Sequence, residues 1–261
     1  MYTAPKPPRG GGGRTRALLY GGITFALVFL LIVGMAVAYL VVRTVTAGGD
    51  PTSAPTTSAT AATTTSASAT PTGEVAEERC WAPEDQGRSS TNPSGKLRGG
   101  GLQFTPPSSF PDRHYTTNLH FTEDSAMAVA PAAADSDWVS TVSVAKVHWQ
   151  DGVEYPGDKA AAERMTDCFI SSSWLWSEAS GRAESNRKGT EVEIDGMTGY
   201  QVTVDYLFTK GPSESITGYA ITLVVVSTPE GPSVFLSEVP VDNAEQKQAV
   251  ADALASVTGI S

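Results

Sequence analysis

The sequence contains few residues that could carry a recognisable chemistry. Of its 261 residues, three are histidine and two are cysteine. It has no Gly-x-Ser-x-Gly or His-Glu-x-x-His sequence and no phosphate-binding glycine loop, which excludes the common motif-defined hydrolases, zinc peptidases and nucleotide-binding proteins. Its one Asn-x-Ser/Thr sequence, at 92–94, is blocked for glycosylation by Pro93. We therefore expect no catalytic residue, no cofactor and no metal site.

Charge is missing altogether from residues 17–42, a run of 26 positions. As a helix it would be roughly 39 Å long, more than the hydrocarbon core of a bilayer. Four cations precede the run and one closely follows it: Lys6, Arg9, Arg14, Arg16 and Arg43. This bias predicts a disordered cytoplasmic tail over 1–16, a single transmembrane helix over 17–42 and an extracytoplasmic remainder. The alternative is a secreted protein released by cleavage after Ala47.

Large apolar side chains are missing from residues 51–72, which are only Pro, Thr, Ser and Ala. Such a segment has nothing with which to build a core, so we predict a disordered stalk over 43–73. It would span about 25 Å as a flexible coil and about 70 Å when extended. Its composition suits O-glycosylation, but a bare spacer is equally compatible with it.

Positive charge is scarce in the predicted extracytoplasmic domain, residues 74–261. This part holds 27 Asp and Glu against 13 Lys and Arg, and 13 minus 27 gives a net charge of −14. Such a balance argues against nucleic acid and against docking onto anionic lipid. It permits cationic partners or metal ions.

The two cysteines, Cys80 and Cys168, both fall in this domain. An even count in an oxidising compartment predicts a disulfide between them. The alternatives are a free buried thiol at Cys168 and an intermolecular link through Cys80. The bond would tie the start of the domain to its interior.

The domain alternates between strand and helix patterns. Helices are expected over 159–170, capped by Asp158, and from an N-cap at Asp242 to about 257. Asp195-Gly196 predicts a hairpin turn, and Gly99–Gly101 is interpreted as a flexible joint. The strands are expected at 102–104, 115–121, 126–130, 138–149, 191–194, 199–208, 219–227 and 233–239. Short turns between successive strands predict an α+β fold with a mostly antiparallel sheet flanked by helices.

Three segments carry a resemblance to a known family: Gly101–Phe110, Ile194–Tyr200 and Asn243–Val257. They resemble the opening strand and proline turn, the central hairpin and the closing helix of actinobacterial cell-envelope proteins of the LpqN/LpqT type. The resemblance implies a PsbP-like α/β/α sandwich and a non-catalytic accessory or binding role. Phe110 stands where that family usually has tryptophan, and a transmembrane helix replaces its lipidated cysteine.

Binding candidates are few. Trp174 and Trp176 can form a partner-contact patch or pack into the core. Glu191, Glu193 and Asp195 share one strand face, which can bind a cation or be simply solvated. Three histidines remain. We expect His114 and His120 to lie at the surface and His148 to have a structural role.

We therefore expect a membrane-anchored, non-catalytic binding or accessory module that contacts an unknown envelope protein or ligand. The alternative is a carboxylate-dependent envelope hydrolase, which requires a deep cleft where acids with perturbed pKa converge.

Overall fold

The computed structural model describes residues 76–260. The predicted tail (1–16), transmembrane helix (17–42), stalk (43–73) and cleavage site after Ala47 lie outside the described residues. Within 76–260, neither helix is both long and apolar enough to cross a bilayer.

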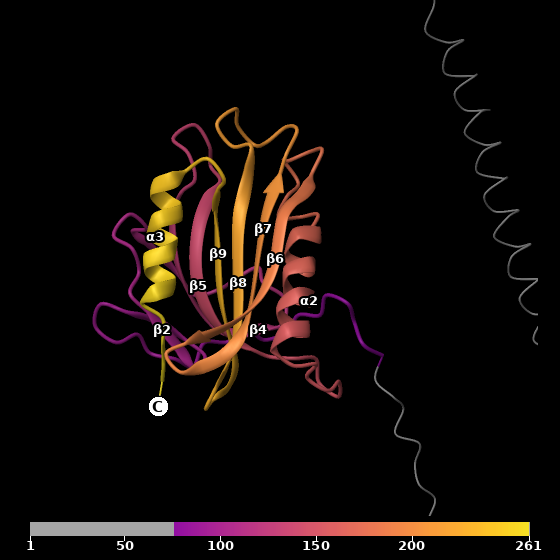
Figure 1. Cartoon of the computed structure of the whole chain (residues 1–261), viewed down its shortest axis with the longest axis vertical. Coiled ribbons are helices and arrows are strands. Elements are labelled where there is room, and N and C mark those ends of the chain that lie inside the picture. Colours follow the sequence, from indigo (N-terminus) through magenta and orange to yellow (C-terminus); the bar gives the residue numbers. More distant parts are fainter. Residues whose placement is uncertain (1–75, 261) are drawn as a thin grey trace, which may run out of the picture. The chain divides into compact units, whose positions relative to one another are not determined.

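A single antiparallel sheet of seven strands organises the fold (Figure 1). Its strands lie in the spatial order β3-β4-β5-β9-β8-β7-β6, and every neighbouring pair is antiparallel. They are β3 (Asp112–His114), β4 (Thr122–Pro131), β5 (Val139–Val147), β6 (Ala183–Ile194), β7 (Met197–Leu207), β8 (Gly218–Thr228) and β9 (Gly231–Pro240). The prediction of a mostly antiparallel sheet with two helices is confirmed.

The two helices lie on opposite sides of this sheet: α2 (Asp158–Ser171) and α3 (Ala244–Ala255). Alternate side chains of the central strands point to opposite faces. On β8, Leu223 and Val225 pack with α2, whereas Val224 and Val226 pack with α3. We call these the α2 face and the α3 face. Because both faces are buried, residues 223–226 of β8 form a continuous apolar run.

A second, small sheet closes the domain. It consists of β1 (Leu97–Gly99), β2 (Leu102–Phe104) and β10 (Thr258–Gly259), so the end of the described chain pairs near its beginning. Gly99 is the last residue of β1, and Gly100 and Gly101 form the turn to β2. A Cβ on Gly99 would lie 2.4 Å from the carbonyl oxygen of Val144. The interpretation of these glycines as a flexible joint is therefore wrong, because the backbone packs too closely against β5 to move freely.

Helix α2 begins one residue earlier than expected and without the predicted cap. Gly157 is its N-cap residue and makes no side-chain hydrogen bond. Asp158 lies in the first turn, where its carboxylate accepts hydrogen bonds from the hydroxyls of Tyr155 and Ser227. The negative charge still favours the helix, since it lies at the positive end of the helix dipole.

The disulfide between Cys80 and Cys168 is present, with a Cα–Cα distance of 5.4 Å. Cys168 lies on the buried side of α2 and is 1% exposed. The prediction of this bond is confirmed, and it fastens the irregular segment at the start of the domain to α2.

Helix α3 is capped by Asn243 and not by Asp242. The Asn243 side-chain oxygen accepts a 3.0 Å hydrogen bond from the Gln246 N–H, as an N-cap side chain does. Asp242 instead accepts a hydrogen bond from the Thr217 hydroxyl. The sequence offers two adjacent capping residues, and this long-range contact decides between them.

The hairpin at Asp195-Gly196 is confirmed, and both residues have positive φ as a two-residue hairpin turn requires. The strand predicted over 115–121 is wrong. Thr117 and Thr122 bond the backbone at Leu119, and these local contacts replace strand pairing there. The remaining predicted strands are present, and β6 begins eight residues earlier than the prediction at 191.

Candidate functional site

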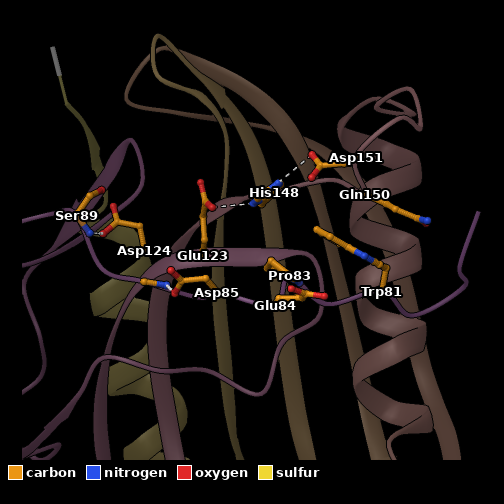
Figure 2. Close-up of a pocket in the computed structure, with 11 residues that line it drawn as sticks. Trp81, Pro83, Glu84, Asp85, Ser89, Glu123, Asp124, His148, Gln150 and Asp151 are labelled. Carbon is orange, nitrogen blue, oxygen red and sulfur yellow. Dashed lines mark hydrogen bonds and ion pairs between the residues drawn. The ribbon is translucent and has the colours of Figure 1, made fainter. Parts of the chain in front are cut away.

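A hollow of about 620 Å³, which we call the acidic cavity, opens where residues 81–89 pass the start of β4 and the end of β5 (Figure 2). Five carboxylate side chains line it: Glu84, Asp85, Glu123, Asp124 and Asp151. Of the described residues that line it, none is Lys or Arg. Its volume is in the range of roughly 300–1,000 Å³ that is typical of small-molecule sites.

Residues 81–89 have no regular secondary structure, so long-range hydrogen bonds must hold this wall of the cavity. The Phe121 N–H donates to the Trp81 carbonyl at 3.1 Å, and the Asp124 N–H donates to the Gly87 carbonyl at 3.1 Å. The disulfide at Cys80 immediately precedes the segment. The wall is thus fastened at its start by a covalent bond and along its length by the backbone.

Asp124 connects three parts of the chain. Its carboxylate accepts hydrogen bonds from the N–H groups of Ser89, Ser90 and Gly100, at 2.8, 2.7 and 2.9 Å, and from the Ser90 hydroxyl. The side chain is 4% exposed, and its backbone has a positive φ at an irregularity in β4. A buried carboxylate with this many donors is a structural anchor for the cavity floor.

The Glu123 side chain points into the cavity, and one basic side chain lies against each of its two carboxylate oxygens. Lys146 Nζ lies 2.7 Å from one of its oxygens, and His148 Nδ1 lies 2.7 Å from the other. The second ring nitrogen of His148 lies 3.5 Å from Asp151 (Figure 2). Each ring nitrogen of His148 therefore faces a carboxylate, at close distance for Glu123 and at the limit of a hydrogen bond for Asp151.

The pKa values of the two inner acids are lowered. For Glu123, partial burial acts to raise the pKa, but hydrogen bonds and positive charge from Lys146 and His148 outweigh it. For Asp124, burial also acts to raise the pKa, and the donors on Ser90, Gly100 and Ser89 outweigh it. Both carboxylates are therefore ionised at neutral pH. A general acid needs a raised pKa, so neither side chain suits that role.

Trp81 forms the aromatic part of the lining. Its ring centroid lies 5.3 Å from that of His148 in an edge-on arrangement and 6.2 Å from that of Phe121. One side of the half-buried indole thus packs on the domain while the residue still lines the cavity. Carboxylates beside an indole are a combination that suits an organic cation.

The structure separates Trp174 and Trp176, for which the sequence left partner contact and core packing open. Trp174 is 71% exposed and remains a candidate for partner contact. Trp176 is 1% exposed, and its indole N–H donates to the Phe169 carbonyl at 3.0 Å. Its inclusion in a contact patch is wrong, because the turn after α2 directs it into the aromatic core.

Glu191, Glu193 and Asp195 are exposed along β6 and its turn, and none of them lines the acidic cavity. Their exposure agrees with the interpretation of a solvated face, and the choice between solvation and cation binding stays a prediction. His114 in β3 is exposed, as predicted, whereas His120, in the irregular segment that follows, is partly buried. Within residues 76–260, no group of three or more His, Cys, Asp or Glu is arranged to hold a metal ion.

The residues that build the cavity were missed by sequence reasoning. There were two local signals. One was the charged pair Glu123-Asp124 just before the strand predicted at 126–130, and the other was Lys146-x-His148 within the strand predicted at 138–149, where charged residues are uncommon. Nothing in the sequence shows that residues 84–89 lie beside them.

No family model and no curated protein matches the chain. Among solved structures, it is similar to PsbP (CyanoP) of the cyanobacterium Synechocystis, with 10% identity and a TM-score of 0.42 over 66% of this chain and 98% of that one. It is also similar to a Pseudomonas aeruginosa protein of unknown function, with 12% identity and a TM-score of 0.34 over 64% and 96%. Both TM-scores are below 0.5, so the PsbP-like sandwich and the LpqN/LpqT type stay predictions.

Proposed function

We propose that the chain is a membrane-anchored, extracytoplasmic, non-catalytic binding module of the cell envelope, and that its acidic cavity holds a cationic group of a partner. The observation that carries this proposal is the lining itself. Five carboxylates, an indole and no Lys or Arg among the described lining residues form a negative hollow with a partly aromatic wall. A lysine or arginine side chain has the charge and the apolar stem to fill it.

The state of the carboxylates favours binding over catalysis. Asp124 is saturated with donors, and Glu123 is held by Lys146 and His148, so both are fixed and ionised before any ligand arrives. A preorganised site avoids the cost of ordering its own side chains on binding. The alternative proposal is a carboxylate-dependent hydrolase, whose general acid would have to be a residue other than Glu123 or Asp124.

The outer carboxylates are the groups available to the partner. Asp151 is 92% exposed at its side chain, and Glu84 makes no hydrogen bond within the described residues. Asp85 accepts only from the nearby Gly87 N–H, at 2.8 Å. These three side chains can therefore be neutralised without disturbing the hydrogen bonds of the cavity floor.

The binding experiment uses the purified full-length chain and a fluorescent pentalysine peptide. We expect E84Q/D85N/D151N to weaken binding by roughly tenfold or more and to reduce its salt dependence, since three charges are removed from one site. The matched control, E191Q/E193Q/E214Q, removes three exposed charges elsewhere. Equal losses in the two variants, or no peptide binding by the unmodified chain, would contradict the proposal.

A photo-crosslinking amino acid at position 84, in intact cells, identifies the natural partner. The same amino acid at position 191 serves as the control for random encounters. We expect a protein that is captured from position 84 only, with a basic segment at the crosslinked site. Capture of the same proteins from both positions would count against a specific partner.

The membrane anchor is tested separately. The proposal rests on the uncharged run at 17–42 and is supported by the Cys80–Cys168 disulfide, since such bonds form in oxidising compartments. We expect the intact chain to stay with membranes after alkaline extraction. Material in the medium that begins at Gly48 would favour the secreted alternative.

A further inference from the structure

A second hollow, which we call the Trp174 hollow, lies on the other side of the segment that walls the acidic cavity. Within 81–87, Ala82 and Gln86 line this hollow, whereas Trp81, Glu84 and Asp85 line the acidic cavity. Its volume is about 320 Å³. That is near the lower limit of small-molecule sites, so a ligand of one small ring would fill it.

The lining of the Trp174 hollow carries no formal charge, although the domain as a whole is strongly acidic. No Asp, Glu, Lys or Arg is among the described residues that line it. The side chains are instead amides, hydroxyls, a histidine and an indole. They include Gln86, Thr117, Asn118, His120, Ser172 and Trp174.

Hydrogen-bonding groups in this hollow are free to meet a ligand. Within residues 76–260, the side-chain amides of Gln86 and Asn118 make no hydrogen bond, although those of Gln150 and Asn92 do. His120 lines the hollow, and its Nδ1 is buried without a hydrogen-bond partner among the described residues. Burial lowers the pKa of His120, so the ring stays neutral at neutral pH.

Trp174 is held in place although its indole is exposed. It lies in a turn closed by backbone hydrogen bonds from Trp176 to Ser172 and from Ser177 to Trp174. Leu175 and Trp176 on the same turn pack into the core of the α2 face. An exposed aromatic ring on a fixed turn loses little conformational freedom when a ligand covers it.

We propose that the Trp174 hollow binds one unit of a neutral saccharide. The indole would stack on the apolar C–H face of a sugar ring, and the amides of Gln86 and Asn118 would bond its hydroxyls. An uncharged lining suits a ligand without charge, because no ion must be stripped of water without a counterion. This site is independent of the cation-binding proposal for the acidic cavity.

The test measures binding of three neutral oligosaccharides, maltotriose, cellotriose and triacetylchitotriose, to the full-length chain by calorimetry and ligand-observed NMR. We expect at least one to bind in the millimolar range or better. Trp174→Ala should weaken that binding by roughly tenfold, the effect of losing one aromatic stacking partner. Asn118→Ala, at an exposed position, should weaken it less.

Two controls keep the result interpretable. The E84Q/D85N/D151N variant should bind the saccharide as the unmodified chain does, because those side chains line the other hollow. Far-ultraviolet circular dichroism and the intact disulfide confirm that each variant is folded. The proposal is overturned if all three oligosaccharides fail to bind, or if W174A binds them unchanged. Binding of phosphatidylcholine vesicles through Trp174, with no saccharide binding, overturns it in favour of a membrane contact.

Discussion

The two faces of the sheet are stabilised in different ways. The α2 face contains a cluster of aromatic rings around Trp176 and carries the disulfide to α2. The α3 face has a mainly aliphatic and alanine core, with three buried phenylalanines, and its helix is placed by an N-cap and by Gln246. Gln246 accepts from the Ser140 hydroxyl at 2.7 Å and donates to the Pro131 carbonyl at 2.9 Å. The disulfide thus lies on the α2 face, and α2 is the helix to which the segment lining both hollows is bonded.

The two faces also differ in what their helices hold in place. Residues 81–87 separate the two hollows and have no secondary structure of their own, so they depend on the bond from Cys80 to α2. The α3 face needs no disulfide, because α3 is held by the packing of its side chains against the strands and by its N-cap. Stability measurements on the domain spanning 74–261 can test this comparison.

The largest effect is expected from removing the disulfide. The bond closes a loop with a sequence separation of 88, for which the chain-entropy model gives about 4.5 kcal/mol. We expect C80S/C168S to lower the free energy of unfolding in urea by about that amount and to abolish binding at both hollows. The α3-face control, Ser140→Ala, should cost about 1 kcal/mol. Similar losses in the two variants would refute the proposed difference between the faces.

A smaller effect, dependent on pH, is expected from Glu238. This residue lies on the α2 face, is 9% exposed, and accepts a 3.1 Å hydrogen bond from Thr141. Burial raises its pKa from the ordinary 4.5 to about 7, despite the opposing effect of Thr141. The folded state therefore holds a proton that the unfolded state releases, so stability falls as pH rises from about 4.5 to about 7.

Replacing Glu238 with Gln removes this titration. We expect E238Q to be more stable than the unmodified domain at pH 8, by about 3 kcal/mol, with the difference shrinking as the pH falls to 4.5. Urea unfolding at several pH values measures it. Parallel stability curves for the two proteins would show that Glu238 does not titrate between these values.

The smallest effect is expected at the cap of α3. Asn243→Ala should cost about 1 kcal/mol, because the Gln246 N–H loses its acceptor. Asp242→Ala is the matched control one residue earlier and should cost less, since Asp242 bonds Thr217 and not the helix. Thermal unfolding measures both. A larger loss for Asp242→Ala would restore the cap that the sequence predicted.

Local patterns predicted much of the fold. The hairpin between β6 and β7 follows from Asp195-Gly196 between alternating segments, and α2 follows from its apolar spacing. The disulfide follows from the even cysteine count and the expected compartment. The choice between Asp242 and Asn243 does not, because it depends on Thr217, which is distant in sequence.

The acidic cavity could not be predicted for the same reason. Glu123 and Asp124 become a site only when residues 84–89 lie beside them, and those residues carry no periodic pattern. The different positions of the two tryptophans could not be predicted from the sequence either. Trp174 and Trp176 are the same residue type two positions apart, and the backbone turn between them sends one to solvent and the other to the core. A sequence pattern does not specify such a turn.

The small sheet has a consequence for the time at which the domain can fold. β10 pairs with β2, which joins residues 258–259 to 102–103, and β9 must insert between β5 and β8 before the large sheet is continuous. Contacts between segments so far apart form late and slow the folding of a chain. A chain made from its N-terminus can complete the large sheet only after residue 240, and the small sheet only after residue 259, has been synthesised. Under the proposed extracytoplasmic location, the final structure therefore forms only after residues up to 259 have crossed the membrane.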